Sequence, residues 1–115
     1  MRLSYDDEGD VLEIIFDERF QSTRKKAFRL RHGIVLYVAN ENTMPVQLTL
    51  VNYRALSQFP VVQFDGWRAL SSSDKEQLLP ILNSPSISAF LKIDPESGSG
   101  HLSSPDMLEI LPVAA

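Results

Sequence analysis

Residues 24–51, RKKAFRLRHGIVLYVANENTMPVQLTLV, decide the fold of this chain. Apolar and polar residues alternate through most of the stretch, and turn-forming residues interrupt it at His32-Gly33 and again from Asn40 onward. Such alternation is typical of β-strands that bury one face, and the interruptions mark the turns between them. The stretch therefore predicts three consecutive antiparallel strands, which cover Arg24–Arg31, Ile34–Val38 and Val46–Val51.

The N-terminal residues add a further hairpin to these strands. Arg2–Tyr5 and Val11–Phe16 have strand-like patterns, and the acidic segment Asp7–Asp10 between them contains a glycine suited to a turn. Because each strand is followed closely by the next, we expect a five-stranded twisted antiparallel β-meander. With the helices predicted below, the fold class is α+β, and residues 1–115 form a single domain of ordinary size.

The register follows from matching the faces of paired strands, since a slip of one residue turns every side chain to the opposite face. A two-residue loop at His32-Gly33 would misalign the apolar residues. A three-residue loop, residues 31–33, sets Leu30 opposite Ile34 and places Gly33 at the left-handed position. The same matching of faces predicts these further pairs: Phe28 with Leu36, Tyr5 with Leu12, Leu3 with Ile14, Val38 with Val46, Leu36 with Leu48, and Ile34 with Leu50.

This register divides the sheet into two faces of different character. The apolar face collects aliphatic and aromatic side chains and is the expected core: Leu3, Tyr5, Leu12, Ile14, Phe16, Phe28, Leu30, Ile34, Leu36, Val38, Val46, Leu48 and Leu50. The mixed face carries both apolar and polar side chains: Val11, Ile15, Ala27, Val35 and Tyr37 with Glu13, Lys25, Arg29, Arg31, Gln47 and Thr49. A fully solvated face would carry fewer apolar residues, so the mixed face is a candidate for partial cover.

The second half of the chain predicts short helices that pack on the sheet. Ser73-Asp74-Lys75-Glu76 has the form of a capping box, and Pro80 should bend or shorten the helix that follows. Ser84-Pro85 and Ser104-Pro105 each place a serine cap before a proline at the first helical position, and Phe90 and Leu91 would lie on one side of the first of these two helices. Residues 94–103, DPESGSGHLS, are expected to form a flexible loop. Trp67 is expected to anchor the linker onto the core, with an interface hot spot as the alternative.

Composition excludes several classes of protein. The chain has no cysteine, which excludes disulfides, thiolate catalysis and Cys-ligated metal sites, and fits a cytoplasmic location. Neither a signal peptide nor a membrane-spanning run is expected from the pattern. Residues 1–58 carry eight Lys/Arg and eight Asp/Glu, so the net charge of −4 resides in residues 59–115. This balance argues against a protein that coats nucleic acid.

Residues 1–56 resemble a family of short bacterial and archaeal proteins, catalogued as domain of unknown function family 2283. Four segments carry the resemblance: Leu3-Ser4-Tyr5-Asp6 with Glu8 and Asp10, then Val11-Leu12-Glu13-Ile14, then Leu30 to Val35, and finally Pro45 to Leu50. The basic third strand and the long C-terminal half depart from the family pattern. The resemblance implies an antiparallel-sheet fold in a prokaryotic protein and no established chemistry, and some family members are suspected antitoxin partners of small toxins.

Candidate chemical sites are few. Asp6, Asp7, Glu8 and Asp10 invite a metal interpretation, but the Asp-x-Asp-x-Asp-Gly frame of a calcium loop is absent, so a polar hairpin turn is preferred. His32 and the second histidine, His101, lack a partner at ligand spacing and are expected to be exposed. The Gly-Ser stretch around Ser99 lacks the context of a nucleophile elbow or a phosphate loop. No catalytic residue, cofactor or metal is therefore predicted.

The mixed face is the predicted functional surface. Its candidate interface residues are Val11, Ile15, Lys25, Arg29, Arg31, Val35 and Tyr37, where the basic side chains form a strip along the third strand. Alternatively these cations pair with Glu13 and other acids, or protect an edge strand from aggregation. We expect a non-enzymatic domain that binds another protein or forms a homodimer. The alternatives are an antitoxin-like module with weak nucleic-acid contact and an enzyme with an unrecognised carboxylate site.

Overall fold

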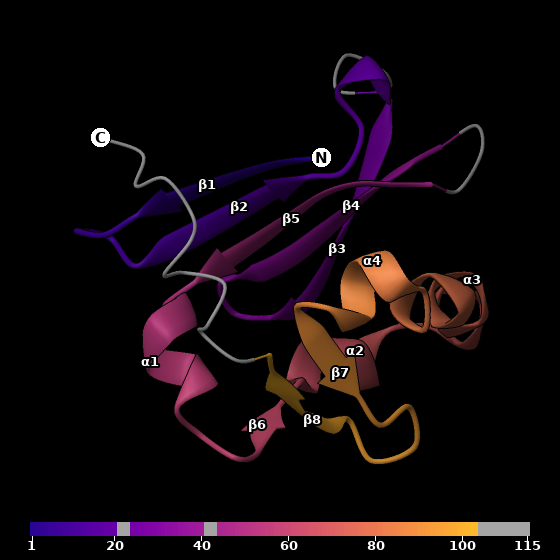
Figure 1. Cartoon of the computed structure of the whole chain (residues 1–115). Coiled ribbons are helices and arrows are strands. Elements are labelled where there is room, and N and C mark those ends of the chain that lie inside the picture. Colours follow the sequence, from indigo (N-terminus) through magenta and orange to yellow (C-terminus); the bar gives the residue numbers. More distant parts are fainter. Residues whose placement is uncertain (21–23, 41–43, 104–115) are drawn as a thin grey trace.

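A computed structural model describes residues 1–20, 24–40 and 44–103 of the chain. Its main element is a five-stranded antiparallel sheet made of β1 (Arg2–Asp6), β2 (Val11–Ile15), β3 (Lys25–Arg31), β4 (Ile34–Ala39) and β5 (Pro45–Val51), with the short 3-10 helix η1 (Glu18–Phe20) between β2 and β3. Four short helices and a smaller sheet follow and gather on one side of the large sheet (Figure 1). The predicted α+β class is confirmed.

The strand order differs from the predicted meander. The sheet runs β1-β2-β5-β4-β3, so β2 pairs with β5 and β3 lies at the edge. Residues 16–24 form a connection longer than a tight hairpin turn, so β3 need not pair with the strand before it. The most basic strand therefore lies at the edge of the sheet, where charged side chains oppose pairing with other chains. Glu13 lies opposite Ser4 and Thr49 and not opposite β3, so the predicted pairing of the basic strand with Glu13 is wrong.

Most of the predicted register is confirmed. Tyr5 lies opposite Leu12, and the pairs Leu3–Ile14, Phe28–Leu36, Leu36–Leu48 and Ile34–Leu50 are all present. Two pairs near turns are wrong, because irregularities shift the ladder there. Arg31, and not Leu30, lies opposite Ile34, and Val38 lies opposite Pro45 instead of Val46. The turn is thus His32-Gly33, with Gly33 in the left-handed region at φ 85°, and the strand takes up the extra residue before it.

The predicted apolar face is the core of the molecule. Ile34, Leu36, Leu48 and Leu50 on the central strands are each 0% exposed. Leu3 and Phe16, nearer the β1–β2 edge, are partly buried against the same cluster. Side chains of the second half, including Trp67, complete this single cluster. Transfer of such side chains out of water contributes about 1.5–3 kcal/mol each, so this face dominates the stability of the fold.

The helices of the second half are short and differ in detail from their predicted form. They are α1 (Tyr53–Ser57), α2 (Asp65–Ala69), α3 (Ser72–Leu82) and α4 (Pro85–Ser88). The cap of α3 is Ser71, whose hydroxyl accepts the N–H of Asp74, so the capping box predicted at Ser73 is wrong. Pro80 lies inside α3 as predicted, and Ser84 precedes α4 with Pro85 at its start. The helix predicted from Ser104 lies outside the described residues.

The segment predicted as a flexible loop belongs to a second sheet. β7 (Leu91–Ile93) and β8 (Ser99–Leu102) form a hairpin, and β6 (Val62–Gln63) pairs with the other edge of β8. Gly98 adopts a φ of 75° in the turn, and its N–H donates to the carbonyl of Asp94. Leu91 pairs with Leu102, and both are buried, which holds the hairpin against the core. Leu91 is therefore a strand residue and not part of the helix that begins at Pro85.

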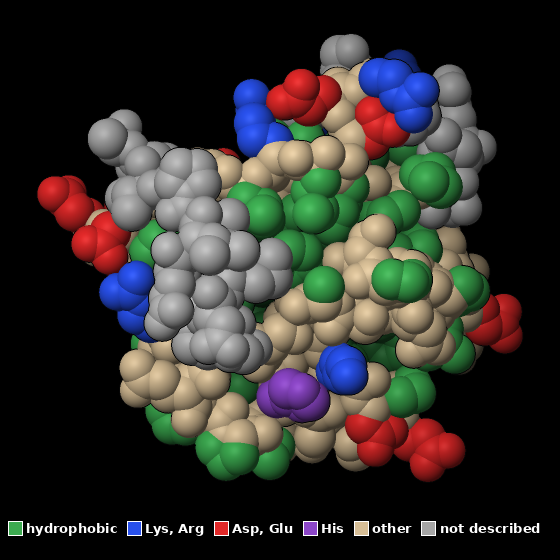
Figure 2. All heavy atoms as spheres, in the orientation of Figure 1, with side chains coloured by type: hydrophobic (Ala, Val, Ile, Leu, Met, Phe, Trp, Pro, Cys, Tyr) green, Lys and Arg blue, Asp and Glu red, His purple; other side chains and the backbone are tan. Residues whose placement is uncertain are grey.

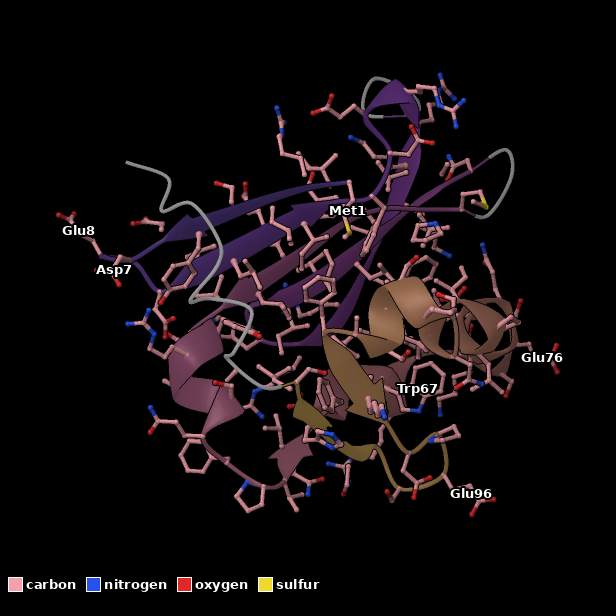
Figure 3. All side chains as sticks on the ribbon, in the orientation of Figure 1. Met1, Asp7, Glu8, Trp67, Glu76 and Glu96 are labelled. Carbon is pink, nitrogen blue, oxygen red and sulfur yellow. The ribbon has the colours of Figure 1, made fainter. Side chains whose placement is uncertain are left out.

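Two close contacts join the second layer to the sheet. Gly66 of α2 lies against the backbone of β3, where an added Cβ would collide with the carbonyl oxygen of Arg29. Trp67, 1% exposed, packs in the core and donates its indole N–H to the carbonyl of Pro95, 3.0 Å away. Figure 3 shows Trp67 between α2 and the small sheet. The prediction that Trp67 anchors this region to the core is confirmed.

Candidate interaction surface

The mixed face is the side of the large sheet opposite the helices. Val11, Val35 and Tyr37 on this face are only partly buried, whereas their neighbours on the apolar face are fully buried. Figure 1 shows the four helices and the small sheet on the other side of the large sheet. Ile15, 8% exposed, is the most protected of the candidate interface residues. The mixed face therefore presents apolar side chains without cover from a described helix.

The pairing of the strands arranges the mixed face in rows across the sheet. One row runs Ser4, Glu13, Thr49, Val35 and Arg29, from β1 through β2, β5 and β4 to β3. The next row runs Arg2, Ile15, Gln47, Tyr37 and Ala27 over the same strands. A third row begins with Asp6, Val11 and Val51. The middle strands β5 and β4 thus carry uncharged side chains in the first two rows, with Glu13 on β2 and Arg29 on β3 to either side.

The predicted basic strip is broken by the shift in β3. Arg29 is exposed and shares the mixed face with Lys25, whose partner is Ala39. Arg31 lies opposite Ile34, whose side chain belongs to the apolar face, and so points to the other side of the sheet. There its Nη1 donates to the carbonyl of Gln63, 2.8 Å away. Arg31 is therefore not part of the mixed face, and this is a correction to the predicted interface.

Arg31 instead borders a shallow hollow beside β6. The hollow has a volume of about 260 Å³ and is lined by Leu56, Phe59, Val61, Val62 and Gln63 in addition to Arg31. Phe59 and Val61 are each 57% exposed. The apolar run at residues 59–62 indicates an apolar surface in the sequence. The sequence does not indicate that Arg31 borders it, because Arg31 reaches this side of the sheet only through the irregularity in β3.

The acidic turn between β1 and β2 has a structural role that the sequence did not reveal. Asp10, at a φ of 54°, accepts a hydrogen bond on its Oδ1 from the hydroxyl of Tyr5, 2.7 Å away. The same carboxylate accepts the backbone N–H groups of Arg54 and Ala55 at 2.8 and 3.1 Å, and thus caps the N-terminus of α1. Since Asn52 makes no side-chain cap there, a residue distant in sequence supplies the cap of this helix.

This network shifts the pKa values of both partners. Partial burial alone would raise the pKa of Asp10, but the donors from Arg54, Tyr5 and Ala55 together hold it below its usual value. Burial first, and then the hydrogen bond to Asp10, raise the pKa of Tyr5 to about 12. A carboxylate with three donors has little free capacity for a metal. Of the other acids in this turn, Asp6 accepts the backbone N–H of Glu8 at 3.1 Å and Asp7 forms an ion pair with Arg54 at 3.4 Å. Glu8 projects away from the body of the molecule (Figure 3).

The histidines lie apart from these features. His32 occupies the β3–β4 turn and is exposed, as predicted. His101 is also exposed, but lies in β8 and not in a loop. Within residues 1–20, 24–40 and 44–103, no group of three or more His, Cys, Asp or Glu side chains is placed to hold a metal ion.

Hydrophobic side chains also reach the surface on the side of the molecule that carries the helices. Figure 2 shows them between the large sheet and α4, while charged side chains lie mainly around the margin of the view. Over the described part of the chain, no helix combines the length and the apolar character needed to cross a membrane.

Comparison of the chain with protein-family models, with curated proteins and with solved structures yields no match in any of the three. The resemblance of residues 1–56 to the family of unknown function therefore stays a prediction.

Proposed function

We propose that this chain is a protein-interaction domain and that the mixed face is its binding surface. One observation carries the proposal: Val35 and Tyr37 on the inner strand β4, and Val11 at the end of β2, are partly exposed on a sheet face that no described helix covers. Apolar side chains in a contiguous group on a surface mark sites of association more often than scattered ones do. A tyrosine in such a group supplies a large contact area and a polar hydroxyl.

The charged residues of the mixed face suit a partner with charges of both signs. Arg29 lies at the β3 side and Glu13 at the β2 side, and both are exposed. Charges at the rim of an interface add little affinity, but they determine which partner binds and in which orientation. The partner in this proposal is a protein, and no cofactor or catalytic step is part of the function.

Affinity capture from cells that produce a tagged and an untagged copy tests this proposal. The wild-type chain should retain a partner protein, which can be the untagged copy itself. Val35→Glu should retain at least tenfold less of that partner, because a carboxylate is then buried in the contact. Gln58→Glu adds the same charge at an exposed position outside the mixed face and should retain the partner. Circular dichroism confirms that each variant is folded.

Retention that is equal in the wild type and in Val35→Glu would show that the mixed face is not the binding surface. A wild-type chain that retains no protein and also stays monomeric at several hundred micromolar would contradict the proposed function itself.

A further inference from the structure

The charges on the mixed face have an arrangement that fits a copy of the same surface. Glu13, Thr49, Val35 and Arg29 lie side by side in one row on four adjacent strands. This part of the row therefore runs from a negative side chain, over two uncharged ones, to a positive one, and Ser4 on β1 lies beyond Glu13. Strands are spaced about 4.8 Å apart, so Glu13 and Arg29 stand roughly 14 Å apart, symmetrically about the boundary between β5 and β4.

Both charged side chains of the row are open to a partner. Glu13 and Arg29 are exposed, and neither forms an ion pair with another residue in the described part of the chain. The ion pairs that are present involve other residues, such as Lys26 with Asp74 on the helix side at 3.0 Å. The strand separation keeps Glu13 and Arg29 from neutralising each other within one molecule.

On the basis of the proposed function, we infer that the partner of the mixed face is a second copy of this chain, packed face to face about a twofold axis parallel to the strands. This axis places β4 of one copy over β5 of the other, and β2 over β3. Glu13 of each copy then faces Arg29 of its partner, on both sides of a centre formed by Val35 and Thr49. Twofold pairing of one patch with itself is the commonest symmetry among homo-oligomers.

Other orientations of the two sheets are less favourable. A twofold axis across the strands would place Glu13 over Glu13 and Arg29 over Arg29, which brings like charges together. Packed sheets lie about 10 Å apart with their strands within about 30° of each other, as the parallel axis allows. Glutamate and arginine side chains that reach toward each other can span this separation. The Glu13–Arg29 pairs thus select the orientation, and at the centre Val35 of each copy packs against Thr49 of the other.

The size of the surface indicates how strong the dimer is. Four strands of about five residues give a footprint of roughly 19 by 17 Å, or about 320 Å², per copy. This area is below the ~800 Å² that each partner buries in a standard interface. A contact of this size belongs with weak, transient interfaces, so we expect a weak dimer. Measurements must extend from low micromolar to several hundred micromolar protein.

Charge exchange in the purified chain tests this inference by sedimentation equilibrium. Glu13→Lys leaves two cations facing each other at each pair, and Arg29→Glu leaves two carboxylates, so each single variant should dimerise at least tenfold more weakly. An equimolar mixture of the two single variants should form a heterodimer in which every facing pair is again of opposite sign. The double variant Glu13→Lys/Arg29→Glu should recover the dimerisation of the wild type within about threefold.

Matched controls separate these effects from a change in net charge. Glu76→Lys alters the net charge as Glu13→Lys does, and Lys92→Glu alters it as Arg29→Glu does, at exposed positions on α3 and β7. Figure 3 shows Glu76 pointing outward from α3. Both controls should dimerise as the wild type does.

Two results would overturn the inference. A wild-type chain that is monomeric at several hundred micromolar excludes the second copy as partner, and the proposed function then survives only if the Val35-dependent capture retains a different protein. A wild-type dimer that the single charge variants leave intact shows that the copies associate in another orientation or through another surface.

Discussion

The two faces of β4 and β5 differ in burial, and we propose a different task for each. Ile34, Leu36, Leu48 and Leu50 point toward the helices and are 0% exposed. Val35 and Tyr37, which alternate with them on β4, point the other way and are partly exposed. Because successive side chains of a strand alternate between faces, stability and recognition can be encoded in adjacent positions with little interference. Substitutions on the two faces should therefore have distinct effects.

Among substitutions on either face, Leu36→Ala should have the largest effect on stability. The side chain is fully buried on a central strand, so its truncation loses apolar contact and leaves a cavity. We expect the free energy of unfolding to fall by about 2–5 kcal/mol, as measured by urea denaturation. A loss below about 1 kcal/mol would show that the apolar face is less tightly packed than the burial of Leu36 indicates.

Gly66→Ala tests how the second layer is held against the apolar side of the sheet. An added Cβ would collide with the carbonyl oxygen of Arg29, and backbone cannot move aside as a flexible side chain can. We expect a loss of about 1–3 kcal/mol in denaturant unfolding from the forced shift of α2. Ser72→Ala at the start of α3, an exposed position, is the matched control and should change stability by less than about 0.5 kcal/mol. Equal effects of the two substitutions would contradict the close approach.

The apolar face is also the part of the fold that the sequence predicts best. Alternation is a local property, so it places Leu36, Leu48 and their neighbours on one face without knowledge of the strand order. The order itself depends on where residues 16–24 carry the chain, and no local pattern indicates this. For the same reason the sequence predicts that β2 pairs with β3, whereas β2 pairs with β5.

The candidate site is harder to predict than the core. Alternation places Val11, Ile15, Val35 and Tyr37 on the mixed face, but one irregularity beside Leu30 moves Arg31 to the other side. Such a bulge adds one residue to a strand and has little signature in a sequence without glycine at that point. The β7–β8 hairpin escapes prediction because its strands are short and β8 is rich in polar residues.

Asp10 caps α1 through contacts with Arg54 and Ala55, which are 44 and 45 positions away in the sequence. Sequence patterns do not reveal a contact over such a separation. Asp10→Ala should therefore cost about 0.5–2 kcal/mol, the usual range for loss of a helix cap. Glu8→Gln, in the same turn but exposed, should cost less than about 0.5 kcal/mol. Thermal unfolding monitored by circular dichroism distinguishes the two. A similar small change for both variants would contradict a capping role for Asp10.

The same network predicts how stability depends on pH. The pKa of Asp10 is lower in the folded chain than its ordinary value of 3.8, so its contribution is present above that value and is lost as the pH falls through the folded pKa. The stability difference between wild type and Asp10→Asn should therefore shrink as the pH is lowered from about 5 toward about 2. Tyr5, with a pKa raised to about 12, contributes below pH 10 and loses its contribution as the pH rises toward 12. A difference that stays constant over the acid range would contradict the acid part of this prediction.

Val35→Thr should have the smallest effect on stability and sharpens the comparison of the two faces most directly. Threonine has nearly the shape of valine, and the side chain is only partly buried on the mixed face, so the hydroxyl can reach water in the monomer. At a protein concentration below one micromolar, urea denaturation should show a change within about 0.5 kcal/mol. At several hundred micromolar, the same variant should dimerise more weakly, because the hydroxyl would be buried at the centre of the contact. Loss of stability without loss of association would reverse the roles assigned to the two faces.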